Sequence, residues 1–181
     1  MIDKEALKTE IRLAFSNMQF PGRGNITNSY ESDEAASMET EFGDKKDWTA
    51  LEADFLDHAP DGFASAPSFF SSTAFRFYLP AYLIADIDDK LEHVNVVFHL
   101  YHGLDETSRA QLINPRRYGN RNWFDYVTER FGSFSSQQAA AVVGYLEFKL
   151  NSGYLAGFEQ ENVRQALANF WQGRVQRGRK T

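Results

Sequence analysis

Residues 69–89 combine aromatic side chains, Arg76 and Pro80 in a stretch whose other residues favour helix. A helix this apolar has to be buried, and a proline inside it bends or breaks it. We therefore expect this segment to organise the core, with Pro80 in the first turn of a new helix or at a kink. Proline is well tolerated at the first helical position, and Ala81 to Asp88 continues a helical pattern.

The bulk composition is that of a globular protein. Of 181 residues, 43% are hydrophobic and 15% aromatic, which is enough for a packed core. The chain has no cysteine, which excludes disulfides and thiolate metal sites. No apolar run approaches the roughly 18 residues that a membrane span needs. We therefore expect a cytoplasmic protein with no membrane partner.

The net charge of −6 is distributed unevenly. Residues 1–92 contain 18 acidic and 8 basic residues, whereas residues 93–181 contain 7 acidic and 11 basic ones. The acidic half argues against non-specific nucleic-acid binding. The basic tail, residues 174–180, is interpreted as a frayed C-terminus.

Helical periodicity and capping residues dominate the chain. We expect an all-α fold: a single domain over residues 1–181, built as an irregular bundle of about seven helices, with a short extended segment near 26–30. The run of valines near residue 96 leaves helix and strand open for 91–104, and Gly103 favours helix. The main segments predicted as helix are 3–18, 32–42, 47–58, 71–88, 91–104, 105–112, 122–131, 135–150 and 159–175.

Three segments together resemble a family of small, uncharacterised bacterial proteins. They are residues 33–36, residues 42–51 and the run Ala-Phe-Arg-Phe-Tyr-Leu-Pro-Ala-Tyr-Leu at residues 74–83. The sequence is similar to a domain-of-unknown-function family that this last run characterises. The resemblance implies a shared fold and assigns no reaction.

The histidines are the first candidates for chemistry. Three histidines are considered as metal ligands. His99 and His102 are three residues apart and would share a helix face, and Asp89 and His93, four apart, would share another, but no Glu-x-x-His pair accompanies them. Residues 86–92 are acidic but lack the glycine of a calcium loop. We therefore predict no metal site and no cofactor, and we identify no catalytic residue.

Arg76 is the most informative single residue. A buried guanidinium needs an acidic partner, because an unpaired buried charge is costly. We predict a structural ion pair with Asp33, Glu34 or Asp47, and an anion-binding arginine is the alternative.

Two functions remain open. The first is a non-catalytic protein-binding domain, of the kind found in immunity proteins or antitoxin-like inhibitors, that meets a basic surface such as that of a toxin enzyme. The second is an enzyme or small-molecule-binding protein with a site around Arg76, Tyr78 and Tyr82. Trp48 is either a surface anchor or, from its spacing to Leu51 and Phe55, a core residue. The predicted binding residues are Tyr30, Glu31, Asp33, Glu34, Glu39, Glu41, Asp44, Asp47 and Trp48.

Overall fold

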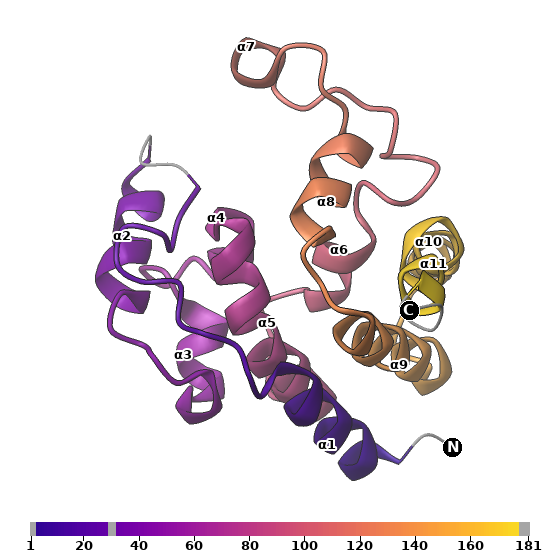
Figure 1. Cartoon of the computed structure of the whole chain (residues 1–181), viewed down its shortest axis with the longest axis horizontal. Helices are drawn as coiled ribbons and strands as arrows, with labels where there is room; N and C mark the ends of the chain where they lie inside the picture. Colours follow the sequence, from indigo (N-terminus) through magenta and orange to yellow (C-terminus); the bar gives the residue numbers. More distant parts are fainter. Residues whose placement is uncertain (1–2, 29–31, 178–181) are drawn as a thin grey trace. The chain divides into compact units, whose positions relative to one another are not determined.

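The computed structural model of the chain describes residues 3–28 and 32–177. The described part consists of helices joined by turns and loops and has no strand or sheet, only isolated antiparallel bridges at Thr27–Phe70 and Leu112–Asn122 (Figure 1). The predicted all-α class is confirmed. Part of the predicted extended segment, residues 29–31, lies outside the described residues. The last residues of the predicted frayed end, 178–181, lie outside them as well.

The chain divides into two compact units, Ile11–Val96 and Met1–Glu10 with Val97–Thr181. We call them the first and the second unit. Helix α1, Lys4–Phe15, contributes residues to both. The single domain over residues 1–181 stays a prediction.

The first unit holds its helices around the aromatic helix α5, Ser72–Ile87. The Phe42 ring at the end of α2 lies 4.9 Å from the Phe70 ring and 5.0 Å from the Tyr78 ring, both edge-on. Such edge-to-face contacts add to the burial of the rings themselves. The other elements of this unit are α2 (Asp33–Phe42), η1 (Trp48–Ala50), α3 (Ala53–His58) and α4 (Ala66–Phe69).

Pro80 lies inside α5, which runs without interruption from Ser72 to Ile87. The expectation that Pro80 lies outside a loop is confirmed, but it does not start a new helix. Pro80 has no backbone N–H to donate to the carbonyl of Arg76, four residues before it. Eleven side chains of this helix are buried, and this burial compensates for the lost bond.

Local capping signals predicted several helix starts correctly. The side chains of Ser32, Ser71, Asn122 and Ser135 each accept a bond from the backbone N–H three residues on. Each satisfies one of the free amides at a helix N-terminus. The helices that follow are α2, α5, α8 (Trp123–Phe131) and α9 (Ser136–Ser152).

Three predicted helices differ in the structure. Residues 47–58 form η1 and α3 in place of one helix, because Leu51 is extended with ψ at 127°. The segment 91–104 is helical only at α6, Val96–Tyr101, where Gly103 ends the turn in the left-handed region with φ at 85°. The segment 105–112 forms turns, and the next helix is α7, Pro115–Tyr118.

The second unit packs one long C-terminal helical segment along α9 (Figure 1). This segment consists of α10 (Gly157–Ala166), the π-helical turn η2 (Leu167–Trp171) and α11 (Gln172–Arg177). Trp171 is fully buried, and its indole N–H donates to the carbonyl of Leu100 at 3.0 Å. The predicted helix at 159–175 is confirmed, but its π-helical turn was not predicted.

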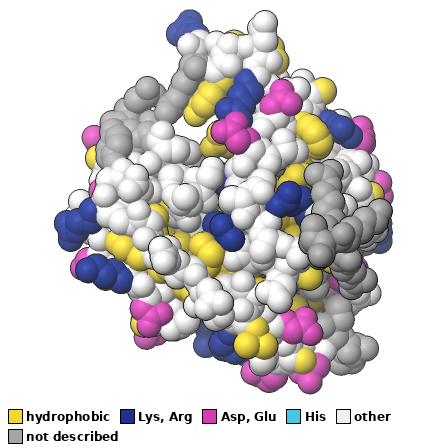
Figure 2. All heavy atoms as spheres, in the orientation of Figure 1, with side chains coloured by type: hydrophobic (Ala, Val, Ile, Leu, Met, Phe, Trp, Pro, Cys, Tyr) yellow, Lys and Arg dark blue, Asp and Glu magenta, His cyan; other side chains and the backbone are white. Residues whose placement is uncertain are grey.

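In the part of the chain that the structure describes, no helix has both the length and the apolar character needed to cross a membrane. The face drawn in Figure 2 carries acidic and basic side chains, with hydrophobic side chains between them.

Candidate functional site

The acidic residues of the predicted binding set differ in their exposure, and their role in binding stays a prediction. Tyr30 and Glu31 lie outside the described residues. The basic residues of the stretch 32–61 are Lys45, Lys46 and one histidine, His58. Six carboxylates of the first unit are exposed in this stretch: Asp33, Asp44, Asp47, Glu52, Asp54 and Asp61.

Three of the predicted binding acids hold the local structure. Glu39 accepts bonds from the amides of Gly24 and Ile26, both at 2.9 Å. Glu41 accepts the amide of Asp61 at 2.8 Å. Asp47 caps η1, and its bonds from the hydroxyl and the amide of Thr49 lower its pKa. Glu39 and Glu41 therefore fix turns next to α2, and Asp47 fixes η1.

Trp48 belongs to the core. Only 6% of it is exposed, which confirms the core interpretation over the surface anchor. The Asp47 cap and the extended backbone at Leu51 direct the Trp48 side chain inward. One side of it lines a surface groove, so Trp48 does not project from the surface.

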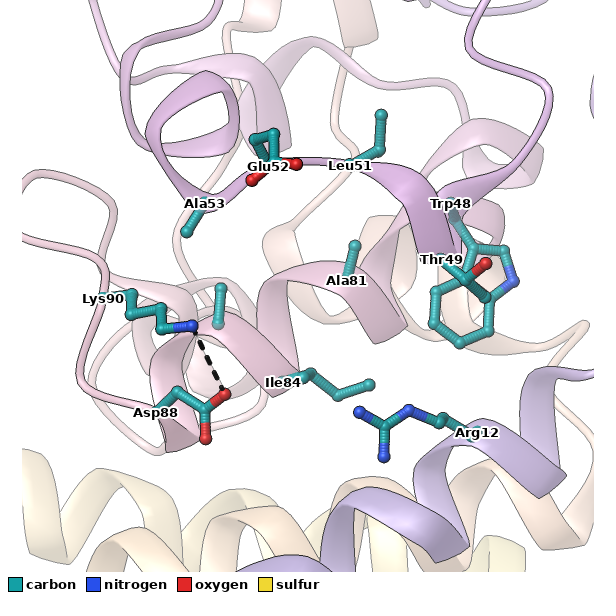
Figure 3. A pocket seen from close by; sticks show the side chains of 11 residues that line it. Arg12, Trp48, Thr49, Leu51, Glu52, Ala53, Ala81, Ile84, Asp88 and Lys90 are labelled. Atoms are coloured by element: carbon teal, nitrogen blue, oxygen red, sulfur yellow. Dashed lines mark ion pairs between the residues drawn. The ribbon is translucent and has the colours of Figure 1, made fainter.

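This groove, which we call the Trp48 groove, lies where residues 48–53 meet α5 (Figure 3). Its volume is about 160 Å³. Residues of η1, the start of α3 and α5 form its apolar lining, and Arg12 of α1 completes one side. The apolar lining consists of Trp48, Leu51, Ala53, Ala81, Ile84 and Ala85.

The rim of the Trp48 groove is charged. Lys90 and Asp88 form an ion pair at 3.9 Å (Figure 3). Arg12 and Glu52 are both exposed, and neither makes an ion pair within residues 3–28 and 32–177. A hollow that is lined in part by apolar side chains and has a charged rim can receive an anchoring side chain of another protein.

The alternative site around Arg76, Tyr78 and Tyr82 is largely closed. The Tyr78 hydroxyl donates to the carbonyls of Phe42 at 2.9 Å and Lys45 at 3.0 Å. Tyr82 is fully buried, and burial raises its pKa well above the usual value. Arg76 is half-buried, and desolvation lowers its pKa. Its ion pair with Asp33, Glu34 or Asp47 stays a prediction.

Asp57 is an anchor that sequence reasoning missed. Its buried carboxylate accepts the amides of Glu92 and His93, both at 2.9 Å, and of Val94 at 3.0 Å. Burial alone raises its pKa, but these bonds and one from the His93 ring lower it to about 2. The ionised carboxylate thus fastens the segment between α5 and α6 to the end of α3. No local signal marks a partner 35 residues away.

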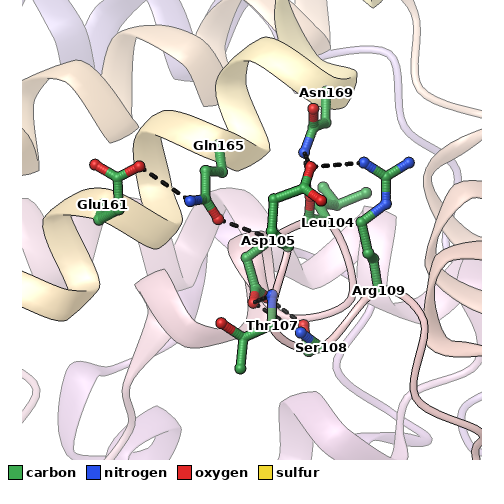
Figure 4. Close-up of polar contacts among 9 residues, drawn as sticks. Leu104, Asp105, Thr107, Ser108, Arg109, Glu161, Gln165 and Asn169 are labelled. Atoms are coloured by element: carbon green, nitrogen blue, oxygen red, sulfur yellow. Dashed lines mark hydrogen bonds and ion pairs between the residues drawn. The ribbon is translucent and has the colours of Figure 1, made fainter.

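A second polar cluster lies in the second unit, where it fastens the turn at 104–109 to the C-terminal helical segment (Figure 4). Asn169 of η2 donates to the carbonyl of Leu104 at 2.9 Å, and the amide of Glu106 donates to Gln165 at 2.9 Å. Asp105 accepts the amide of Ser108 at 2.9 Å and also its hydroxyl. The partners of this cluster are internal, which gives it a structural role.

The comparison with protein families gives one match. The model of the family of unknown function DUF6714 covers residues 3–175. The chain belongs to this family. No curated protein and no solved structure matches it. The expected membership of an uncharacterised domain family is confirmed, and the family match spans residues of both units.

The described residues bring no three histidine, aspartate or glutamate side chains together as metal ligands. His99 is largely buried, and burial lowers its pKa to about 3, with the charges of Arg130 and His102 adding to the effect. Of the predicted pair, His99 lies on α6 with a largely shielded ring, and His102 follows the end of this helix.

Proposed function

We propose that this chain is a non-catalytic protein-binding domain whose partner presents a basic surface. The observation that carries the proposal is the Trp48 groove, one side of which is formed by the acidic stretch 32–61. A partner inserts an apolar side chain against Trp48 and Ile84, and its basic residues face Glu52 and the neighbouring acids. A bacterial toxin enzyme with a basic cleft is the class of partner that this arrangement would inhibit.

A second exposed feature supports a protein partner. The turn after α3 displays Phe63, which is 64% exposed. The preceding Asp61 is held by Ser37 and by Glu41 of α2, so the turn has a defined position. An exposed aromatic ring beside carboxylates is a typical interface anchor.

The groove is tested by filling it. The protein is used as bait in the native host, and the recovered partner is titrated against variants. Ala53→Trp should fill the groove and weaken binding at least about tenfold, since the anchoring side chain is excluded. Ala50→Trp is the matched control, because Ala50 is exposed on η1 and does not line the groove.

The charge contribution is tested separately. Glu52→Lys with Asp54→Lys should slow association and reduce its dependence on salt, because exposed charges steer the encounter. Glu10→Lys with Glu147→Lys makes the same charge change outside the stretch 32–61 and should have little effect. If both the filled and the charge-reversed variants bind at full strength, the proposal is wrong.

A further inference from the structure

Two histidine rings of the first unit lie against each other although they are far apart in the sequence. His58 is the last residue of α3, and His93 lies in the segment between α5 and α6. Their ring centroids are 5.3 Å apart with a 41° tilt. The two side chains are 51% and 54% exposed, so an ion from solvent can reach both rings.

Asp57 is responsible for this pairing. It fastens residues 92–94 by accepting three successive backbone amides, and His58 follows it directly in the chain. One buried carboxylate thus brings the two rings together. The pair is part of the folded framework and does not depend on the chance approach of two mobile side chains.

The hydrogen bonds of the two rings determine which nitrogens carry protons. His93 Nδ1 lies 3.0 Å from the Asp57 carboxylate, and His58 Nδ1 lies 2.8 Å from the carbonyl of Asp54. An ionised carboxylate and a carbonyl only accept, so both Nδ1 atoms must donate. In the neutral rings, both Nε2 atoms therefore keep a free lone pair. Metal-binding histidines are held in this way, with the other ring N–H donated to a carboxylate or a carbonyl.

The spacing of the rings also suits a shared ion. A metal about 2.1 Å from Nε2 lies about 3.2 Å from the ring centroid, so two imidazoles on a tetrahedral ion have centroids about 5.2 Å apart. The observed separation is 5.3 Å. The surroundings are negative, since the charges of Asp54, Asp57 and Glu92 act on the His58 ring.

We propose that His58 and His93 form a two-nitrogen site for a borderline divalent cation, Zn²⁺ or Cu²⁺, through their Nε2 atoms. Water completes the coordination, since the described residues supply no third ligand. Imidazole ligands favour these ions over Mg²⁺ and Ca²⁺. The site is separate from the Trp48 groove and does not depend on the proposed function.

The experiment is a calorimetric titration of the full chain, without a polyhistidine tag, with Zn²⁺ and with Cu²⁺. One ion should bind per chain, Cu²⁺ more tightly than Zn²⁺, and Mg²⁺ should not bind. His58→Gln and His93→Gln should each weaken binding at least about tenfold. His102→Gln is the matched control and should bind like the parent protein.

Nuclear magnetic resonance of the ring nitrogens gives a second measurement. Without metal, at a pH high enough for both rings to be neutral, His58 and His93 should show protonated Nδ1 and bare Nε2, and the metal should shift their Nε2 signals and leave those of His99 unchanged. The proposal is overturned if the parent protein binds neither ion, if His102→Gln loses as much affinity as His58→Gln, or if the double variant of His58 and His93 still binds one ion tightly. His58 is exposed, so His58→Gln remains informative if His93→Gln does not fold.

Discussion

At the scale of single residues, two tyrosines on one helix have opposite roles. Both belong to α5 and both are buried. The Tyr78 hydroxyl donates to two backbone carbonyls, whereas the buried Tyr82 hydroxyl has no hydrogen-bond partner among the described residues. A buried hydroxyl without a partner has lost its bonds to water with no compensation.

We predict that removal of each hydroxyl shows this difference. Tyr82→Phe should leave the free energy of unfolding unchanged or raise it by up to about 1 kcal/mol, because no bond is lost. Tyr78→Phe should lower it by about 1–2 kcal/mol, because two carbonyls lose a donor. Urea denaturation of both variants measures the difference. An equal loss in the two variants would show that the Tyr82 hydroxyl is bonded in the folded protein.

At the scale of elements, the π-helical turn η2 positions side chains that a regular helix would place elsewhere. It directs Asn169 to the carbonyl of Leu104 and Trp171 to the carbonyl of Leu100. A π turn inserts one residue into a helix and so shifts the face that follows it. The turn thus joins the C-terminal helical segment to α6 and the residues after it within the second unit.

We expect the Asn169 contacts to stabilise this unit measurably. Asn169→Ala should lower the free energy of unfolding by about 1–2 kcal/mol, since it leaves the carbonyl of Leu104 without this donor. The amide of Glu106 should exchange with deuterium faster, because the neighbouring turn is held less firmly. Gln172→Ala, an exposed position on the next turn, is the control. The structural role of Asn169 is refuted if the two variants have the same stability and exchange.

At the scale of the whole molecule, the stability should depend on pH through the interior histidine. Burial lowers the pKa of His99 to about 3, against 6.5 for the same group in an unfolded chain. Between these values the unfolded chain binds a proton that the folded protein does not, so the free energy of unfolding falls as the pH decreases. One proton corresponds to a slope of about 1.4 kcal/mol per pH unit.

We predict that His99→Leu reduces this slope between pH 6.5 and 5 by up to about 1.4 kcal/mol per pH unit, the value for one proton. Its absolute stability at pH 7.5 differs for reasons of packing, so the slope is the quantity to compare. Urea denaturation at several pH values gives it. His102→Gln is the comparison at a less buried position on the same turn. A slope identical to that of the parent protein would mean that His99 is protonated inside the folded chain.

Short-range signals predicted much of the fold. Ser32, Asn122 and Ser135 start helices because each cap contacts an amide only three residues on. The segment 105–112 shows the limit of such reasoning. This segment forms turns in place of the predicted helix, and the backbone amide of Glu106 donates to Gln165 of α10, which lies 59 residues further along the chain. Polar side chains of this kind compete with the helix for the backbone amides.

The candidate sites were less predictable than the fold. The acidic stretch 32–61 can be read from the sequence, but the burial of Trp48 and the groove beside it depend on how η1 packs against α5. The Glu39 carboxylate likewise accepts the amides of Gly24 and Ile26, which lie in a turn 13 residues or more away. Whether a carboxylate is free for a partner is decided by such contacts.

The sequence by itself determined that this chain is helical, where most of its helices begin, and that the segment 69–89 contains a strongly apolar helix, α5. Periodicity and caps act over three or four residues and need no tertiary contact. The tertiary structure alone decided that Asp57 fastens residues 92–94, that His58 meets His93, and that Trp48 lines a groove. These features join residues some 35 positions apart, and only the folding of the chain brings such residues together.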